Sequence, residues 1–584
     1  MSRSRRSAGR ALPPLLCAAA ALLAAGAAAG QARLDFELHD EPGEGGEPGS
    51  WRVVARVTGA DPRAGALRFE TNGWGWPDDG GYFELVSSDP PVAEAAEGGP
   101  PLALRRPPRW SGDARLVYRL RVAQRGSDEH QRFGLAPSRG DGFAYGHSQN
   151  TLLRPYQEGD PLDAEVRITL VAAQADGPLI SGWAGSAHGR RSVVPELPWG
   201  NSPVVFGAPR STASVAAGDL RVEVFQLTGT GAAEHCADLV RRLAPAMARA
   251  TGWPARSPSR VFLSDAMGGG MGSDYGLHLN FPRDAGLGHE RGFWFQTTLA
   301  HELFHEWLGV RLHESSGSLV WFREGFTEYF AQWFCAAEGI TPRERFAETL
   351  EEFDRYAGRN SSFRRTPFAR PGVRWRDGDG PNELSAYRGA PVLALALDVE
   401  LRDAGHPGLL SLVRDLLARD EHVFPPATVR EWFVAHGLEE RWNDWVAGVD
   451  VPSAADSLRR AGFVPTDVPV DVAYLGLHTV EEKPIWRVLG VDPGGPAAKA
   501  GVEVGDVIDG FYPFNGAPTR LMELDTPYTF GLDIFTPGLE GSFLGVKRGD
   551  EKLQLFVEPE LRPWGLRTGW GVGEGVDAFF SFEP

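Results

Sequence analysis

The sequence predicts a multidomain protein in which a β-sandwich precedes an α+β, mainly helical domain and a smaller β-domain. Three observations lead to this fold class. A chain of 584 residues has room for about three to five domains. Apolar residues alternate with polar ones up to residue 207, and recur at helical spacing in much of 208–464. Near Pro465 the composition changes, because all lysines of the chain follow this point.

Residues 31–207 carry the β-rich signal. Leu116, Tyr118 and Leu120 alternate with arginines, and Val166, Ile168 and Leu170 repeat the pattern. Such alternation is typical of antiparallel strands with one buried face, and Gly/Pro clusters separate the runs. We therefore expect a sandwich domain.

Residues 1–30 have the features of a secretory signal. Arginines open the segment, an Ala/Leu run begins at Ala11, and small residues at 27–30 indicate cleavage near Ala29. The alternative is an uncleaved amino-terminal anchor. The residues that flank the arginines and Cys17 match a twin-arginine signal and a lipoprotein signal only weakly. We expect an exported protein, periplasmic or extracellular, and no later apolar run reaches membrane-spanning length.

The net charge indicates one class of partner that is not expected. The formal charge of −18 becomes −22 without the four arginines of residues 1–30, because no acidic residue lies there. Such a surface repels phosphate backbones, so nucleic acid is not an expected partner.

After residue 30 the only cysteines of the sequence are Cys236 and Cys335. They permit one disulfide, but their apolar helical contexts fit buried thiols equally well.

The region 208–464 is expected to begin with strands at 220–226 and 259–263 and a helix at 233–250 between them. Two apolar helices follow, at 293–310 and 319–334. The first carries His301-Glu302-Leu303-Phe304-His305, and the second carries Glu324. Residues four apart share a helix face, so His301 and His305 can bind one metal ion.

These residues predict one catalytic Zn²⁺. Glu324 completes a set of three ligands and leaves one position for water, whose pKa zinc lowers to about 7. Glu302 can accept the proton of that water and later protonate a leaving amine. A purely structural role for the two histidines is the alternative, but both helices supply the context that a chance match lacks. Glu328, one turn after Glu324, is either a partner of a ligand histidine or a solvated surface residue.

At these residues the chain resembles the gluzincin metallopeptidases. The spacing from His305 to Glu324 is similar to that of the membrane-alanyl aminopeptidase family, whereas the segment 321–330 resembles the glycyl aminopeptidase family. The resemblance implies a thermolysin-like catalytic domain behind a β-sandwich. The segment 387–402 is similar to the helix that follows the zinc helices in both families, which implies that Tyr387 donates to the oxyanion of the tetrahedral intermediate. A half-buried core tyrosine is the other interpretation.

The chain departs from the glycyl aminopeptidase pattern before the zinc helix. The family's Gly-Gly-Leu-Glu-His motif corresponds to a segment in which His278 occupies the Glu position. A strand at 275–281 could still pair with a substrate as an edge strand. Asp274 could replace the missing carboxylate for a free amino terminus, and endopeptidase and aminopeptidase both stay open. His278 and His289 fit loop or core positions better than extra zinc ligands.

The region 465–560 resembles a PDZ domain. Tyr474-Leu475-Gly476-Leu477 matches its carboxylate-binding loop, and 491–508 matches its helix and following strand. The resemblance implies a C-terminal peptide as a ligand, bound by backbone N–H groups and strand addition. The extension 561–584 has no assigned role.

The hypothesis is therefore an exported zinc metallopeptidase acting on a peptide or protein substrate, with an aminopeptidase as one version. The alternative is a non-catalytic envelope adaptor that binds protein C-termini and keeps zinc for structure. A third hypothesis is that the protein hydrolyses a non-peptide bond, because zinc-activated water attacks many carbonyls.

Overall fold

The computed structural model describes residues 32–581 except for a set of short and longer gaps. The gaps are 44–48, 62–65, 71–81, 97–98, 105–110, 125–136, 141, 158–159, 163, 174–177, 184, 189–190, 198–201, 218–219, 230, 256–258, 265–269, 274–275, 281–288, 315–318, 360–365, 370–384, 420–422, 483–484, 514–521, 524–541, 550 and 559. The expected signal segment lies outside the described residues. The chain divides into two compact units, one running up to Gly207 and the other consisting mainly of Ala208–Pro584.

The described residues of the first unit form three β-sheets and one short helix, α3 (Ser148–Thr151). One sheet has the order β16-β13-β1-β2-β7-β4, the second β15-β14-β17-β10-β9-β8 and the third β12-β11-β3-β6-β5. The strands are β1 (Ala32–Glu41), β2 (Ser50–Thr58), β3 (Leu67–Glu70), β4 (Phe83–Asp89), β5 (Val92–Ala96), β6 (Gly99–Leu104), β7 (Ala114–Arg121), β8 (Ala123–Gln124), β9 (Ser138–Gly140), β10 (Phe143–His147), β11 (Arg154–Gln157), β12 (Asp160–Pro161), β13 (Ala164–Val171), β14 (Pro178–Ser181), β15 (Gly185–His188), β16 (Arg191–Leu197) and β17 (Pro203–Gly207).

The alternating sequence pattern places the core of this unit between two of its sheets. Leu116, Tyr118 and Leu120 of β7 are fully buried, as their alternation predicts. The ring of Trp51 on β2 contacts that of Phe206 on β17 edge to face, with centroids 5.2 Å apart. These strands belong to different sheets, so this contact joins the two sheets.

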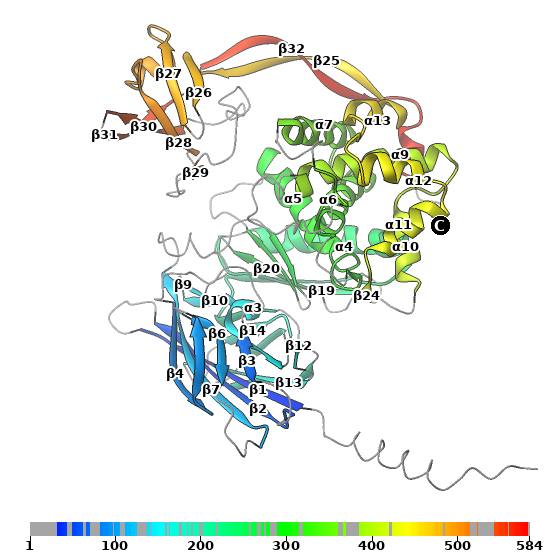
Figure 1. Cartoon of the computed structure of the whole chain (residues 1–584). Coiled ribbons are helices and arrows are strands. Elements are labelled where there is room, and N and C mark those ends of the chain that lie inside the picture. Colours follow the sequence, from blue (N-terminus) through cyan, green and yellow to red (C-terminus); the bar gives the residue numbers. More distant parts are fainter. Residues whose placement is uncertain are drawn as a thin grey trace, which may run out of the picture. The chain divides into compact units, whose positions relative to one another are not determined.

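The second unit begins with a five-stranded sheet of order β18-β19-β20-β22-β21 (Figure 1). Its strands are β18 (Ser211–Ala217), β19 (Leu220–Gln226), β20 (Ser259–Ser264), β21 (Gly270–Ser273) and β22 (Gly276–Asn280). Helix α4 (Ala232–Thr251) connects the parallel strands β19 and β20 and packs against the sheet. Its apolar stripe follows the 3.6-residue period, which is why the sequence predicted this element closely.

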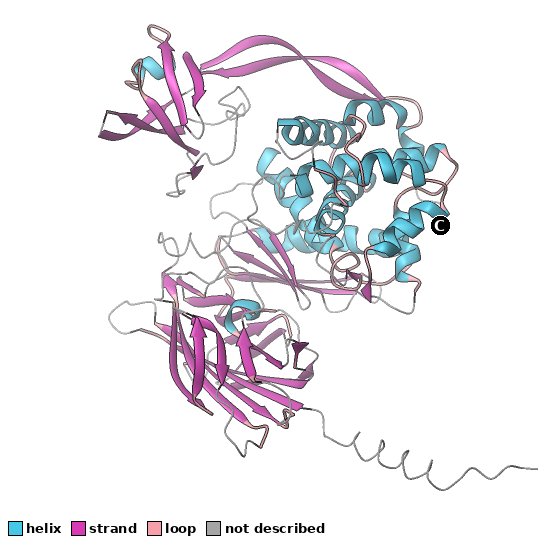
Figure 2. Cartoon of the chain, in the orientation of Figure 1, coloured by secondary structure: helices cyan, strands magenta, loops and turns pink. Residues whose placement is uncertain are grey.

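Helices follow this sheet and form the largest core of the molecule (Figure 2). They are α5 (His289–Phe304), α6 (Val320–Ala337), α7 (Arg343–Arg359), the π-helical turn η1 (Ser385–Gly389), α9 (Ala390–Asp403), α10 (Leu410–Leu417), α11 (Ala427–Ala435), α12 (Glu439–Arg441), η2 (Trp442–Val446) and α13 (Ala454–Arg460), with a small strand pair β23 (His313–Glu314) and β24 (Val423–Phe424). Among the described residues no helix has both the length and the apolar character to span a membrane. Cys236 and Cys335 are buried free thiols. Of the two alternatives, buried thiols and a disulfide, the structure therefore has the buried thiols.

A two-stranded ribbon leads out of the helices and returns to them. Strand β25 (Phe463–Tyr474) pairs antiparallel with β32 (Glu560–Val572), and the short helix α15 (Val576–Phe579) follows. Phe463, Trp570 and Phe579 are buried in the helical core. The extension that had no assigned role is thus the second strand of the ribbon and its anchor (Figure 1).

Between the two ribbon strands lies the C-terminal β-domain. Its strands are β26 (Leu477–Glu482), β27 (Ile485–Val491), β28 (Val507–Pro513), β29 (Met522–Glu523), β30 (Ser542–Arg548) and β31 (Glu551–Val557), in the order β26-β27-β28-β30-β31 with β29 beside β28. One helical turn, α14 (Pro496–Lys499), interrupts them. A separate small core holds this domain, formed by Val488, Ala497, Val502, Ile508, Leu544, Val546 and Val557.

Candidate metal centre

Helix α5 ends one residue before the second histidine of the motif. The sequence predicted a helix through residue 310, but α5 ends at Phe304 and turns follow. Gly309 has a φ of +134°, which a continuing helix does not allow. The N–H of His305 still donates to the carbonyl of His301 at 3.2 Å. The last helical hydrogen bond therefore keeps both imidazoles on one face.

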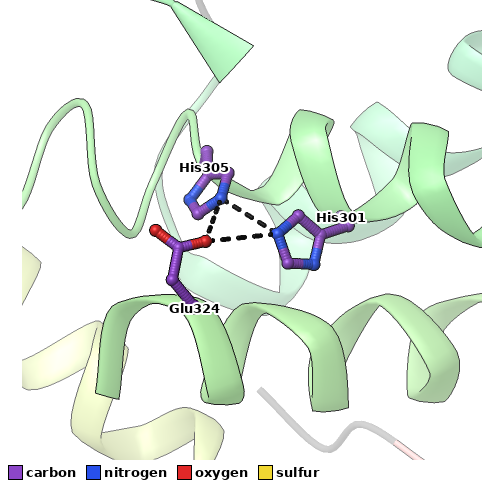
Figure 3. Close-up of side chains that lie close together, drawn as sticks. All are labelled: His301, His305 and Glu324. Atoms are coloured by element: carbon purple, nitrogen blue, oxygen red, sulfur yellow. Dashed lines mark hydrogen bonds and ion pairs between the residues drawn. The ribbon is translucent and has the colours of Figure 1, made fainter. Parts of the chain in front are cut away.

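Three ligand atoms from α5, its C-terminal turn and α6 meet at one point (Figure 3). The two Nε2 atoms of His301 and His305 lie 3.1 Å apart, and Oε2 of Glu324 lies 3.5 Å and 3.2 Å from them. A tetrahedral zinc with ligand bonds of about 2.05 Å separates its ligand atoms by about 3.3 Å. The triangle thus has the size that zinc requires.

The outer nitrogens of the two histidines fix which atoms face this point. Nδ1 of His301 lies 2.8 Å from Oε2 of Glu328, and Nδ1 of His305 lies 2.9 Å from the carbonyl of Leu308. Both partners accept hydrogen bonds, so Nδ1 of each ring is the donor to its partner and Nε2 of each ring faces Glu324. A metal ion bound at this point would take both Nε2 atoms and the carboxylate as ligands.

The electrostatics of the cluster favour a positive charge. Burial lowers the pKa of His301, but hydrogen bonds with Glu324 and Glu328 outweigh it and raise the pKa to about 10. Burial raises the pKa of Glu324, yet His305 and Arg323 hold it well below its usual value. Glu324 is only 6% exposed, and Nε of Arg323 donates to its Oε1 at 2.7 Å. Arg323 therefore occupies one carboxylate oxygen and leaves Oε2 for the metal.

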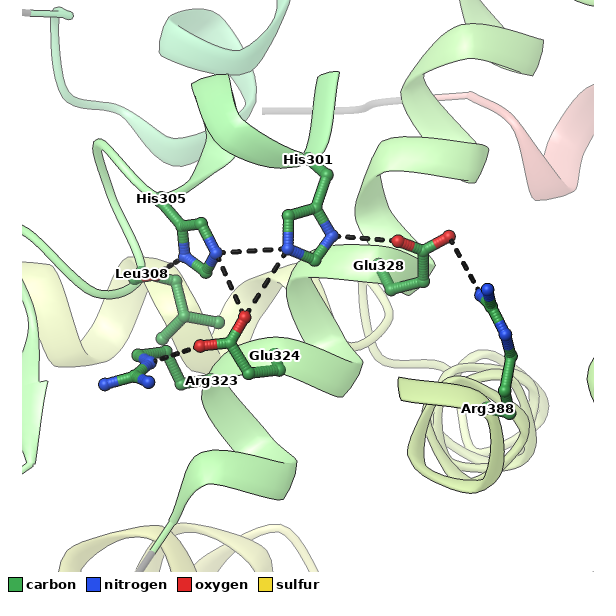
Figure 4. A network of polar contacts seen from close by, with 7 residues as sticks. All are labelled: His301, His305, Leu308, Arg323, Glu324, Glu328 and Arg388. Atoms are coloured by element: carbon green, nitrogen blue, oxygen red, sulfur yellow. Dashed lines mark hydrogen bonds and ion pairs between the residues drawn. The ribbon is translucent and has the colours of Figure 1, made fainter. Parts of the chain in front are cut away.

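Glu328 is a hydrogen-bond partner of His301, and of the two alternatives the solvated surface position is wrong. Its side chain is 12% exposed, and its Oε2 accepts from His301 (Figure 4). Its Oε1 accepts from Nε2 of Gln332 at 3.0 Å and lies 3.9 Å from Nη1 of Arg388. Such a carboxylate orients a ligand histidine and raises its basicity.

Glu302 lies between the two histidines in the last turn of α5. Its side chain is 7% exposed, and its charge contributes to raising the pKa of the adjacent His301. A buried carboxylate beside the ligands is the position that a general base requires.

Tyr387 lies on the π-helical turn η1, next to the first ligand. Its half-buried ring is nearly parallel to that of His301, with centroids 6.3 Å apart and 24° between the planes. Single π-turns are frequent at functional sites. Gly325 allows this approach, because a Cβ there would lie 2.3 Å from Cβ of Ala390 and 2.8 Å from the carbonyl of Ala386. The turn thus brings Tyr387 to the ligands across 60 residues of sequence.

The strand before the zinc helix differs from its prediction. We expected 275–281 to be an edge strand, but β22 is paired on both sides, in parallel with β20 and antiparallel with β21. The edge is β21 (Gly270–Ser273), and it packs against α5. His278 is fully buried, lies 2.7 Å from Oγ of Ser264, and has a pKa lowered to about 3 by burial. His278 is thus a core residue, while Asp274 lies outside the described residues.

Backbone hydrogen bonds from residues after β27 hold the loop that precedes β26. The carbonyl of Leu475 accepts from the N–H of Ala497, and that of Gly476 accepts from the N–H of Asp492, at 2.9 Å and 2.8 Å. Gly476 has a φ of +70°, and Leu475 and Leu477 pack against the core of the C-terminal β-domain. Tyr474 ends β25, and its side chain lies outside the described residues.

Sequence reasoning missed Arg323, Gln332 and Arg388 as parts of the site. Gln332 and Glu328 are four residues apart, and this spacing alone is a usable signal. Arg388 follows Tyr387 directly, but nothing in the sequence indicates that it faces α6.

The solved structure of an aminopeptidase N family protein from Idiomarina loihiensis has the same fold, with a TM-score of 0.62 at 15% identity, over 94% of this chain and 100% of that chain. An M1 zinc metallopeptidase from Deinococcus radiodurans aligns with a TM-score of 0.45 at 16% identity, over 72% of this chain and 96% of that chain. No protein-family model and no curated protein sequence matches this chain. The predicted multidomain architecture of sheets and helices is therefore confirmed.

Proposed function

We propose that this protein is a zinc-dependent metallopeptidase that hydrolyses peptide bonds. The observation that carries the proposal is the convergence of His301, His305 and Glu324, whose ligand atoms all lie within 4.8 Å of one another. Structural zinc sites have four protein ligands. Three ligands meet here among the described residues, with Glu302 beside them, and this set fits a catalytic rather than a structural ion.

The residues of the site divide the chemistry between them. A zinc ion held by the three ligands would supply a Lewis acid that polarises the substrate carbonyl and activates water. Glu302 takes the proton from the attacking water on its carboxylate and passes it to the leaving amine. Tyr387 donates its hydroxyl to the developing oxyanion. Glu328 keeps the Nδ1 proton of His301 in place, so Nε2 stays a ligand atom.

Replacement of the base tests this function. Glu302→Gln removes the proton acceptor without removing a ligand, so we expect retained zinc and a loss in kcat of about 10²–10⁴-fold. Zinc content and hydrolysis of a peptide library are measured together. Glu306→Gln is the matched control, because Glu306 also directly follows a histidine of the motif and its carboxylate pairs with Arg311 at 3.4 Å. Unchanged turnover of Glu302→Gln would refute the mechanism.

The mode of attack on a polypeptide is proposed to be that of an aminopeptidase. The aminopeptidase N-like fold and the resemblance of 321–330 to the glycyl aminopeptidase family support this choice. Among the described residues β21 is the edge strand of its sheet and packs against α5, and an extended substrate can add to such an edge. Matched peptides with free and acetylated amino termini test it. Preference for the free terminus is expected, and equal cleavage of both would instead indicate an endopeptidase.

We further propose that the protein is exported and that its C-terminal β-domain is a PDZ-type module. The arginine-rich, then apolar residues 1–30 support export, and the backbone-held loop 474–477 at the start of β26 supports the module. Cell fractionation tests the first statement. Binding of peptides with free and amidated carboxyl ends tests the second, and equal binding of both would contradict it.

A further inference from the structure

Arg388 occupies a position between two elements of the site. It lies on η1 directly after Tyr387, and its guanidinium stands 4.3 Å above the ring of Phe353 on α7. On the other side its Nη1 lies 3.9 Å from Oε1 of Glu328 (Figure 4). The side chain is 28% exposed.

We propose that Arg388 is a positioning residue that aligns the Glu328–His301 pair with Tyr387. The inference rests on the proposed zinc-peptidase function. It assigns Arg388 a role in two parts of the site at once, the orientation of a zinc ligand and the placement of the oxyanion donor.

The first part of the role concerns Glu328. Its carboxylate is largely buried and uses one oxygen for His301, while the other faces Gln332 and Arg388. The guanidinium of Arg388, held over the ring of Phe353, lies beside Oε1. It thereby holds the carboxylate in the orientation in which Oε2 accepts from Nδ1 of His301.

The second part concerns Tyr387. One peptide bond joins the two residues, and both lie in a five-residue π-turn. The contact with Phe353 fixes the guanidinium plane on α7, and Gly325 fixes the other side of the turn against α6. A shift of Arg388 must therefore move Tyr387 relative to His301.

An arginine at this position can act on both Glu328 and Tyr387, whereas a lysine can act only on Glu328, through its charge. The planar guanidinium stacks on an aromatic face and still presents N–H groups to a carboxylate, while an ammonium keeps only the charge. Charge and stacking can thus be separated by substitution. The charge acts on zinc affinity through Glu328, and the stacking acts on turnover through Tyr387.

The test uses Arg388→Gln and Arg388→Lys in the full-length zinc enzyme. The control is Arg441→Gln, because Arg441 also bonds a glutamate, Glu400, at 2.9 Å and stands over a ring, that of Trp445, at 5.4 Å. Three quantities are measured: the zinc dissociation constant by chelator competition, kcat and KM for a short peptide, and the melting temperature.

Arg388→Gln should weaken zinc binding about 10-fold, at the lower end of the effects of outer partners of metal ligands. It should also lower kcat with little change in KM. Arg388→Lys should recover zinc affinity but not kcat, and Arg441→Gln should change neither. These results would support both parts of the role.

Other results would overturn the proposal. If the zinc dissociation constant and the kcat of Arg388→Gln both stay within about two-fold of the wild-type values, the proposal is refuted. Full recovery of kcat in Arg388→Lys would refute the coupling to Tyr387. Wild-type enzyme that binds zinc but cleaves no peptide would refute the proposed function, and the effect on zinc affinity would still decide the role of Arg388.

Discussion

The helical core and the C-terminal β-domain belong to the same compact unit but are stabilised in different ways. Around the metal centre, α5 and α6 are enclosed by large aromatic side chains, and Trp307 and Trp321 are fully buried. Among its described residues the β-domain has a core of seven aliphatic side chains, and backbone hydrogen bonds hold its loop. Catalysis needs side chains fixed by several neighbours, whereas a backbone-mediated binding loop needs only a correct main-chain path.

Loss of a ligand should have the largest effect and should be confined to the helical core. Glu324→Ala removes the third ligand and leaves Arg323 without its carboxylate. We expect zinc affinity to fall by more than about 100-fold, beyond the range for outer partners, and peptide hydrolysis to disappear. Bound zinc is measured directly, and amide hydrogen exchange reports on the β-domain. Altered exchange in β26 to β31 would contradict the separation of the two regions.

The close approach of α6 to η1 gives the next effect. Gly325→Ala places a Cβ 2.3 Å from Ala390, so the helices must separate, at a cost of about 1–3 kcal/mol of stability. Because Tyr387 moves with η1, kcat should fall more than zinc affinity. Thermal unfolding, zinc binding and kinetics are compared with Gly571→Ala on the ribbon, where the nearest atom would lie 3.4 Å away. Equal effects of both substitutions would contradict this reasoning.

The β-domain should respond to acid through Asp506. Its carboxylate is buried and accepts from Nε and Nη2 of Arg548, both at 2.8 Å, and from the N–H of Glu503. Burial raises the pKa of Asp506, but the hydrogen bonds from Arg548 outweigh it, so the pKa lies below its usual value. A lowered pKa stabilises the fold above the usual carboxyl pKa and loses this contribution as the pH falls below it.

Asp506→Asn should therefore make the stability of the β-domain less dependent on pH in the acid range. Hydrogen exchange of β28 and β30, measured from neutral to acid pH in both proteins, checks this. Zinc content and hydrolysis of short peptides should stay unchanged at neutral pH. A loss of zinc in this variant would show that the two regions are coupled.

The smallest effect is expected at the junction between the regions. Nε1 of Trp570 on β32 donates to Glu351 on α7 at 2.8 Å. Trp570→Phe keeps most of the ring and removes this hydrogen bond, so the free energy of unfolding should fall by about 0.5–1.5 kcal/mol. Chemical denaturation measures the change. Turnover of a short peptide should match wild type, and a lower kcat would place the ribbon among the determinants of catalysis.

The sequence predicted what depends on local periodicity. His301, His305 and Glu324 follow from helical spacing, and the helix and strands before them were predicted almost to the residue. The sequence could not decide the role of Glu328, because its environment depends on η1, some 60 residues away. The same distance explains why Arg388 was missed.

Two further differences have tertiary causes. Strand β22 was expected at an edge, but the short, glycine-containing segment of β21 pairs beside it, and so short a strand has little sequence signal. The ribbon depends on pairing between residues about 100 apart, such as Phe463 and Val572. The extension 561–584 had no role assigned from the sequence, and in the structure Phe579 and Phe580 of this segment are buried.

The ribbon also determines how the chain responds to cleavage. Because the β-domain is inserted between β25 and β32, its two ends are both anchored in the helical core, through Phe463 and Trp570. A single cut within the domain leaves each fragment with one ribbon strand and one buried anchor. A protease that nicks the domain therefore does not release it, and both fragments migrate together until the protein is denatured.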